Sequence, residues 1–174
     1  MKLHSKLILS LAILTVSLVA CEKVDVFEKN ISLKDHHWPS PVKPEISFSI
    51  TDTLSRYNIF VVVRHNDAYR YNNLWLNIYT LSPGDSVARP QALDLQLASN
   101  EQGWLGSGMD DIFEHRIKIS QNPVSLKAGT YRFQLEQIMR DDPLESILNV
   151  GIRVERTPNC LCHCDFFPAR NLPC

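Results

Sequence analysis

The stretch GTYRFQLEQIM, residues 129–139, shows most clearly how this chain folds. Its Tyr131, Phe133 and Leu135 alternate with polar residues, and a period of two is typical of a β-strand with one buried face. A second stretch, LNVGIRVE at 148–155, repeats the alternation after a turn built on Asp-Asp-Pro. Its expected inward residues are Leu148, Val150, Ile152 and Val154. This part of the chain therefore predicts two long strands.

Five earlier stretches share this composition, and turns or glycine-rich segments separate them, such as PGD at 83–85. Alternating or β-branched residues fill 45–50, 57–64, 72–80, 93–97 and 113–119. No stretch shows the period of 3.6 residues that an amphipathic helix requires. We therefore expect an all-β domain of two packed antiparallel sheets. This is a β-sandwich, jelly-roll-like, with an immunoglobulin-like topology as the alternative.

The chain begins with an apolar run that ends at a cysteine. Lys2 and Lys6 precede 14 mostly apolar residues at 7–20, too few to cross a bilayer of roughly 30 Å. The letters LVAC at 18–21 match a bacterial lipobox, in which a nucleophilic thiolate takes a diacylglycerol. We therefore expect residues 1–20 to be a lipoprotein signal peptide and Cys21 to be the lipidated membrane anchor.

The remaining chain divides into three parts. Residues 21–44, broken by three prolines, are expected to form a lipidated tether, 45–156 the sandwich, and 157–174 a disordered cysteine-rich tail. The tail contains CLCHC at 160–164, for which a local disulfide knot and a metal site are the alternatives. Because cysteine is otherwise absent after Cys21, the sandwich is expected to be stable without disulfides.

The charge balance excludes one class of partner. Residues 1–20 contain two lysines and no acid, which leaves 16 basic residues against 19 acidic ones and no basic block. This composition argues against nucleic acid as a partner. The chain also has no fingerprint of a serine hydrolase, zinc protease, phosphate loop or dinucleotide fold. We therefore predict no catalytic residue, no cofactor and no metal site, and expect that the protein is not an enzyme.

One predicted strand has aromatic residues on its polar face. Trp75 and Tyr79 lie four residues, or roughly 13 Å, apart along the strand. Asn73 and Asn77 lie beside them. Aromatic faces stack on sugar rings and amides bond to hydroxyls, so this face is a candidate glycan platform. The alternative, which we favour, is that a loop such as 103–108 covers the indole of Trp75.

Four segments, in order, resemble the gliding-motility lipoprotein family GldH of the Bacteroidetes. They are RHNDAYRYNNLWL at 64–76, GWLGSGMDD at 103–111, GTYRFQLEQIMR at 129–140 and NVGIRVE at 149–155. The family shows similar strings: two tyrosines one residue apart before an NL-aromatic-L strand, a GxWLGxG loop, a GTYxFxxxQxMR strand and a closing VGIRIE-like strand. The resemblance extends from residue 21 to residue 155, and the tail after Arg156 has no counterpart in it.

The resemblance implies an outer-membrane lipoprotein associated with the motility machinery, without a known catalytic residue or cofactor. We expect a non-catalytic component that docks other envelope or motility proteins. The alternative is a carbohydrate-binding envelope lipoprotein. The candidate partner or glycan contacts are Trp75, Tyr79, Asn73, Asn77, Trp104 and Arg140. Arg140 has a second, structural interpretation as an ion pair with Asp141 or Glu136. Because EKVDV after Cys21 is a weak version of an acidic surface-export signal, we expect the protein to face the periplasm.

Overall fold

The computed structural model describes residues 26–157. The predicted signal peptide, the anchor Cys21 and the cysteine-rich tail from residue 158 onward lie outside the described residues. Within them, strands dominate, and the helical element is a short 3-10 turn, η1 (Lys34–His36). No helix in this part of the chain is both long enough and apolar enough to cross a membrane.

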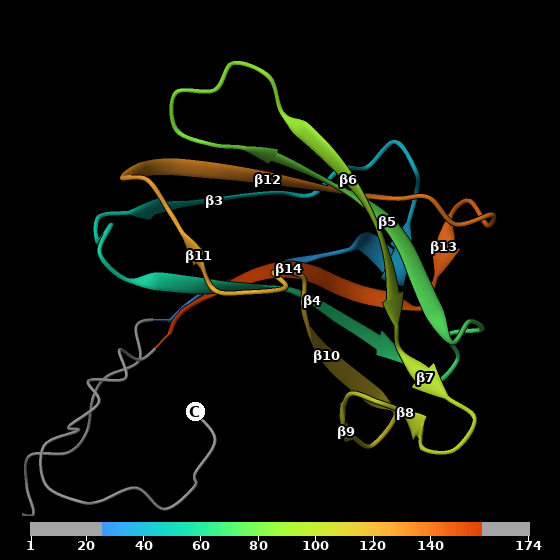
Figure 1. Ribbon diagram of the computed structural model, residues 1–174. Coiled ribbons are helices and arrows are strands. Elements are labelled where there is room, and N and C mark those ends of the chain that lie inside the picture. The colour runs from blue at the N-terminus through green and yellow to red at the C-terminus, as the bar shows by residue number, and fades with distance from the viewer. Residues whose placement is uncertain (1–25, 158–174) are drawn as a thin grey trace, which may run out of the picture. The chain divides into compact units, whose positions relative to one another are not determined.

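Two antiparallel sheets face each other (Figure 1). The first contains, in spatial order, β1 (Val26–Ser32), β14 (Ile147–Arg156), β4 (Arg56–Asn66), β10 (Ile112–Lys118) and β9 (Ser107–Met109), with β11 (Val124–Ser125) also paired to β4. The second contains β3 (Glu45–Ile50), β12 (Gly129–Gln137), β5 (Asn73–Leu81) and β6 (Arg89–Gln96). Two short ribbons complete the described strands: β2 (His37–Trp38) with β13 (Leu144–Glu145), and β7 (Ala98–Ser99) with β8 (Gly103–Trp104).

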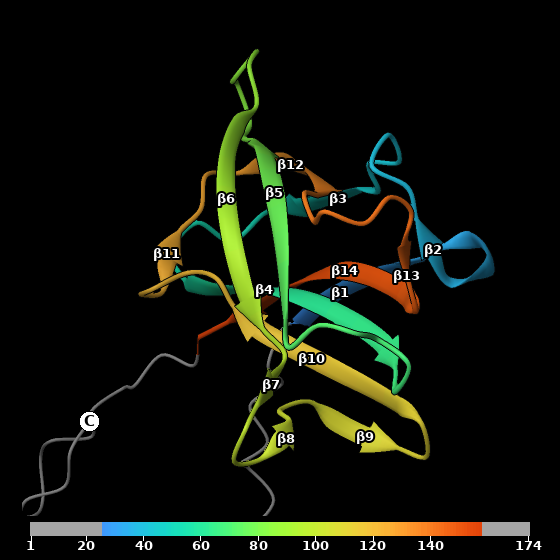
Figure 2. The same ribbon diagram turned by 90° about the vertical axis from the view of Figure 1, so that its right-hand side faces the viewer.

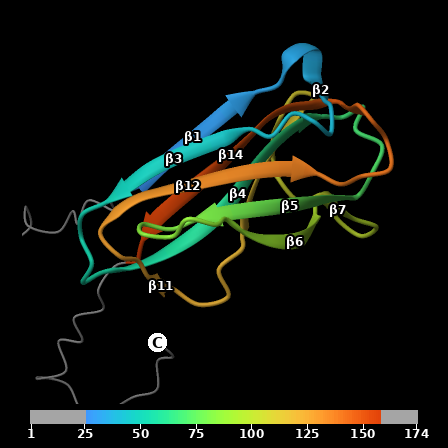
Figure 3. The same cartoon turned by 90° about the horizontal axis from the view of Figure 1, so that it is seen from above.

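The strand order identifies the topology. Numbered one to eight along the chain, the long strands run 1-8-3-6 in the first sheet and 2-7-4-5 in the second. Each strand of the first half thus pairs with its mirror position in the second half: β1 with β14, β3 with β12, β4 with β10 and β5 with β6. Figure 3 shows strands of the two sheets overlying one another. This nested order is that of a jelly roll, so the all-β sandwich prediction is confirmed and the immunoglobulin-like alternative is wrong.

The core lies between the sheets, where the predicted alternation points the apolar residues inward. Tyr131, Phe133 and Leu135 are buried, and Phe48 stacks on the first two at 5.5 and 5.6 Å between ring centroids. Phe27 of the first sheet meets Phe48 of the second at 5.3 Å, which closes the sandwich on the β1–β3 side. These aromatic contacts bury large apolar areas that stabilise the sheet pair.

The last strand departs from its predicted pattern at its beginning. Leu148 was expected inward, but Ile147 is fully buried and Leu148 is half-buried. The cause is a β-bulge: Ile147 is opposite His65 and Asn149 is opposite Arg64, which leaves Leu148 as an extra residue. A single inserted residue exchanges the inward and outward positions, so the alternation is correct only from Val150 onward.

Most of the predicted tether is folded, which corrects the predicted boundary at residue 45. Residues 26–32 form β1 and pair along their whole length with β14. Trp38 is 0% exposed, and its indole N–H donates a hydrogen bond to the carbonyl of Val42 at 2.8 Å. Strand β1 lies at a sheet edge and has no fully buried residue, so its sequence shows only weak alternation.

The sandwich has two distinct ends, on the left and right of Figure 1, and Figure 2 views the molecule from the right-hand end. We call the proximal end the one where the described chain begins at Val26 and ends at Thr157, next to the β3–β4 loop at 51–55. The distal end carries the connections at 67–72, 97–111 and 138–146. The three motif-rich connections therefore gather away from the start of the domain.

Candidate functional site

The distal connections contact one another directly. The backbone N–H of Asp67 donates to the carbonyl of Asp111 at 2.8 Å, and the hydroxyl of Tyr71 donates to the Asp141 carboxylate at 2.6 Å. The N–H of Ile138 donates to the carbonyl of Trp75 at 3.0 Å. Three of the four motifs quoted from the sequence thus meet at one end of the domain.

A cluster of aromatic rings packs inside the sandwich next to the distal connections. Strand β4 delivers His65 to the interior, where its ring lies 4.4 Å from the Trp104 ring and 5.2 Å from the Tyr69 ring, between centroids. Phe113 lies 5.7 Å from both His65 and Trp104. The Trp-Leu-Gly loop therefore uses Trp104, a predicted contact residue, chiefly as a packing anchor, with the indole half-buried.

Two buried histidines are hydrogen-bonded inside the cluster. The Nε2 atoms of His65 and His115 are 2.9 Å apart, and His65 Nδ1 lies 2.7 Å from the Asn66 carbonyl. A carbonyl only accepts, so His65 carries its proton on Nδ1 and accepts at Nε2 from the N–H of His115. Burial lowers the pKa of His65, and burial together with the neighbouring His65 lowers the pKa of His115 to about 4. Both rings are thus neutral at physiological pH.

Sequence reasoning missed His65, although a signal for it exists. The residue continues the inward alternation of Val61 and Val63 in β4. A histidine in that register is a buried polar group, which requires a hydrogen-bond partner.

Two glycines of the loop at 103–108 lie where the loop backbone comes close to β10. A Cβ on Gly106 would come 2.6 Å from the carbonyl oxygen of Glu114 and 2.9 Å from the His115 ring. A Cβ on Gly108 would come 2.8 Å from the Phe113 ring. Any side chain at either position would push the loop away from β10, so the loop geometry requires glycine.

Gln137 fixes the turn that follows β12. Its Oε1 accepts from the N–H of Met139 at 2.8 Å, and its Nε2 donates to the carbonyls of Trp38 and Asp141 at 3.4 and 3.3 Å. Asp142 is held by Ser40, whose N–H and hydroxyl donate hydrogen bonds to the Asp142 carboxylate at 2.8 and 2.6 Å. The segment 138–142 is therefore held by buried and surface polar contacts together.

Two exposed apolar side chains, Trp75 and Ile138, lie beside the distal connections, and the cationic Arg140 follows two residues after Ile138. Trp75 is 42% exposed and Ile138 is 41% exposed, and their backbones are hydrogen-bonded neighbours on the outer face of the second sheet. Loop 103–108 therefore leaves the indole of Trp75 uncovered, contrary to the alternative that we favoured. Arg140 is exposed and forms no ion pair with a described carboxylate within 4.0 Å, so the structure shows no ion pair to Asp141 or Glu136. We call Trp75, Ile138 and Arg140 the distal patch.

The predicted glycan platform is divided by a polar network. The Tyr79 hydroxyl donates to Glu136 at 2.6 Å, and Lys43 Nζ lies 2.8 Å from the same carboxylate and 5.0 Å from the Tyr79 ring centroid. Hydrogen bonds from Lys43 and Tyr79 lower the pKa of Glu136. The amides of Asn77 and Asn73 also have partners, donating to Glu136 at 3.3 Å and to Asp94 at 2.7 Å. Only Trp75 of this group keeps a substantially exposed side chain.

The fourth motif, NVGIRVE, lies in β14 and contacts the edge strand β1 of the first sheet. A Cβ on Gly151 would come 2.5 Å from the Lys29 carbonyl oxygen, so glycine lets β1 lie close to β14. The Arg153 guanidinium donates to Glu28 at 2.9 Å and to Glu155 at 3.1 and 3.2 Å. This motif therefore fastens the first strand of the domain.

The distal end presents an exposed surface, and a cavity of about 450 Å³ beside the loop at 103–108 is lined by Gly106, Ser107 and His115 among others. Among residues 26–157, no group of three or more His, Cys, Asp or Glu side chains is placed to hold a metal ion. The fold and this end together define a jelly-roll domain whose motif residues support an exposed surface.

A family model described as "GldH lipoprotein" matches residues 25–154, so the chain belongs to the GldH lipoprotein family. It is 29% identical over 147 residues to a "Gliding motility lipoprotein GldH homolog" of Christiangramia forsetii, covering 80% of this chain and 89% of that protein. It is 28% identical over 163 residues to the "Gliding motility lipoprotein GldH" of Flavobacterium johnsoniae, covering 90% and 99%. The family resemblance seen in the sequence is thereby confirmed.

Similarity to solved structures is weaker. The crystal structure of the infectious bursal disease virus VP2 subviral particle matches 78% of this chain and 33% of its own, with a TM-score of 0.35 and 14% identity. The Gx strain structure of the same virus gives a TM-score of 0.36 and 13% identity, over 77% of this chain and 32% of that chain. These likenesses are too low to support a conclusion about function.

Proposed function

We propose that this protein is a lipid-anchored, non-catalytic docking component of the machinery linked to gliding motility, and that it binds a partner protein through the distal patch. The anchor is Cys21, in an outer membrane, with the domain facing the periplasm. The observation that carries the proposal is that three family motifs build the end of the domain opposite to the end where the described residues begin at Val26.

The chemistry of the distal patch suits a protein partner. Tryptophan and arginine are the residues most enriched among those that dominate binding free energy at protein interfaces. Trp75 lies on a sheet strand, and Arg140 lies in a segment held by Gln137 and Asp142. A patch that is rigid before binding loses little conformational entropy on association.

Glycan binding has less support from the geometry. A flat sugar platform needs two open aromatic faces, and Lys43 lies over the ring of Tyr79. Asn77 and Glu136, which would bond to hydroxyls, already bond within the network. A glycan would therefore meet Trp75 alone.

The test is cross-linking in living cells with the full lipoprotein carrying a C-terminal tag, followed by denaturing purification and mass spectrometry. We expect envelope or motility proteins to be enriched with the native sequence, and to be lost with Cys21→Ser, which releases the protein from the membrane. Trp75→Ala and Arg140→Ala should each reduce the same proteins by about ten-fold, since a dominant contact contributes well over 1 kcal/mol.

Arg132→Ala is the matched control. Arg132 is also exposed and lies on β12, which pairs with β5, the strand that carries Trp75. Its ion pair with Glu45, at 3.3 Å, lies on the surface. We expect Arg132→Ala to leave the enriched proteins unchanged. Equal recovery of all proteins by Trp75→Ala, Arg140→Ala and the native chain would refute docking through the distal patch. Binding of an isolated glycan that only Trp75→Ala abolishes would favour the carbohydrate-binding alternative.

A further inference from the structure

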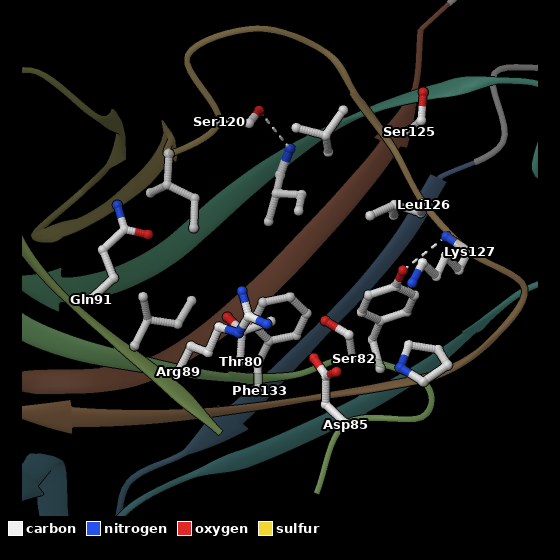
Figure 4. A pocket seen from close by; sticks show the side chains of 16 residues that line it. Thr80, Ser82, Asp85, Arg89, Gln91, Ser120, Ser125, Leu126, Lys127 and Phe133 are labelled. Carbon is white, nitrogen blue, oxygen red and sulfur yellow. Dashed lines mark hydrogen bonds between the residues drawn. The ribbon is translucent and has the colours of Figure 1, made fainter. Parts of the chain in front are cut away.

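A cavity of about 490 Å³ lies between the two sheets on the side away from the β1–β3 closure (Figure 4). Its walls are the inner face of β5, β6 and β12, residue Ile59 of β4, and the connection at 119–127. The apolar floor consists of Ile59, Ile78, Ile119, Val124, Leu126 and Phe133. This volume is in the range of sites that hold small ligands.

The inner face of the second sheet changes from apolar to polar along this cavity. In the inward register, Leu95 and Leu93 of β6 are followed toward the opening by Gln91 and Arg89. On β5, Ile78 lies opposite Gln91 and Thr80 lies opposite Arg89, so this strand also changes from apolar to polar toward the opening. Gln91 and Arg89 are exposed, so they place a hydrogen-bonding group and a positive charge at the solvent-facing end of the cavity.

The opening of the cavity is cationic. Arg89 and Lys127 line it, and Asp85 is the one carboxylate among its lining residues. Neither cation forms an ion pair within 4.0 Å with a described acidic side chain. Two cations against one acid leave a net positive opening above an apolar floor, which complements an anionic amphiphile.

The cavity lies at the proximal end, where the described chain begins. Val124 and Ser125 pair with Tyr57 and Arg56, and the carbonyl of Arg56 accepts from the N–H of Thr157 at 2.8 Å. Val26 lies two strands from β4, or about 10 Å.

Cys21 precedes Val26 by only five positions, which span at most about 18 Å when extended. With Cys21 lipidated as proposed above, the proximal end would be held within a short distance of the bilayer surface. Leu54, 95% exposed in the neighbouring loop at 51–55, adds an apolar side chain at this end.

We propose that this cavity binds one acyl chain of an anionic membrane phospholipid, with the chain on the apolar floor and the phosphate at Arg89 and Lys127. The proposal rests on the anchored location of the proposed function. Binding a lipid at the proximal end fixes the orientation of the domain, so that the distal patch points away from the membrane.

Other occupants fit less well. A sugar needs open aromatic faces, but Tyr131 and Phe133 are almost completely buried. A partner strand would have to pair with the free edge of β6, where Pro90 has no N–H and Asp94 adds a charge. Proline and charge are the features that discourage pairing at a sheet edge.

The experiment uses the lipidated full chain in vesicles of phosphatidylethanolamine and phosphatidylglycerol. The probe is phosphatidylglycerol with a photoactivatable diazirine in one acyl chain, and labelled peptides are mapped by mass spectrometry after illumination. We expect labels in residues 119–127 and 89–96. Gln91→Trp, which fills the cavity from an exposed position, should reduce this labelling by about ten-fold.

The matched control is Ala92→Trp, because Ala92 is on the same strand and faces the outer side, and it should leave labelling unchanged. Arg89→Ala should abolish the preference for the phosphatidylglycerol probe over a phosphatidylcholine probe with the same acyl chain. Flotation of the vesicles tests the anchor separately, so failure of lipid anchoring and failure of the cavity are distinguishable. Thermal melting confirms that the variants are folded.

Two outcomes would overturn the proposal. Labels confined to the 51–55 loop and unaffected by Gln91→Trp would show surface contact without an occupied cavity. Labelling of the cavity in the Cys21→Ser chain but not in the lipidated chain would show that the protein's own anchor occupies it.

Discussion

Two neutral histidines make the domain sensitive to acid. His65 and His115 form a buried pair whose pKa values lie below the ordinary value of about 6.5. As the pH falls below about 6.5, histidines of the unfolded chain bind protons that the folded pair does not bind, so the free energy of unfolding decreases. The decrease from His115 ends near pH 4, where the folded state also binds its proton.

We therefore predict that the native protein loses stability between about pH 6.5 and pH 4, measured by urea unfolding across this range. His115→Gln keeps an N–H donor for His65 but does not titrate, so it should reduce the slope by up to about 1.4 kcal/mol per pH unit. His37→Gln is the control, since His37 is exposed. Identical slopes for the native chain and His115→Gln would contradict the prediction.

The close approach at Gly106 leads to a second prediction. Gly106→Ala should reduce the free energy of unfolding by about 1–3 kcal/mol, because the new methyl group meets the backbone of Glu114, which cannot move without displacing β10. Chemical denaturation measures the change. Ser107→Ala, at the next and exposed position, should change it by less than about 0.5 kcal/mol. Equal effects of the two substitutions would show that the loop does not rest on β10.

At the level of elements, strand β1 provides a test of where the domain begins. Gly151→Ala should push β1 away from β14, because its methyl group would come within 2.5 Å of the Lys29 carbonyl. Hydrogen exchange of the full lipoprotein should then show faster exchange of amides in 26–32, with β12 unchanged. Ser47→Ala, at an exposed position of β3, serves as the control. Rapid exchange of the amides of 26–32 already in the native chain would contradict a folded β1 and support the tether that the sequence predicted.

The sequence predicted the long strands whose two faces differ clearly in polarity. Stretches such as 129–139 and 72–80 pair as expected, because burial of one face imposes a period of two. Strand β1 was missed because both its faces are partly exposed, and the beginning of β6 was missed because Pro90 argues against a strand. Pro90 is tolerated there because β6 is the free edge of its sheet.

The candidate sites were less predictable than the strands. Trp75 and Arg140 were named from the sequence as candidate contacts, but the network around Glu136 that engages the Tyr79 side chain depends on Lys43, which is distant in sequence. The cavity depends on how far apart the two sheets lie near β6, and a single sequence does not encode that separation in a readable pattern. Contacts between distant segments therefore account for most of what the sequence did not reveal.

At the scale of the whole molecule, nested pairing predicts slow and cooperative folding. Every long-range pair must close a long loop before it gains contacts, and such topologies fold in about milliseconds to seconds. We expect refolding of the detergent-solubilised lipoprotein in this range by stopped-flow fluorescence, with Trp38 as a fully buried reporter. Equilibrium transitions by fluorescence and far-ultraviolet circular dichroism should coincide. Two separated transitions would show that the sheets unfold independently.

The nested order also determines when the domain is completed during secretion. A chain that leaves a translocation pore with its N-terminus first presents Val26–Ser32 before any other described strand, yet these residues pair with Ile147–Arg156, which emerge last. Until then β1 has no strand partner, and the apolar face of the growing sandwich meets solvent beside the membrane. We therefore expect an exported chain with this topology to need shielding from aggregation until its final strand has crossed.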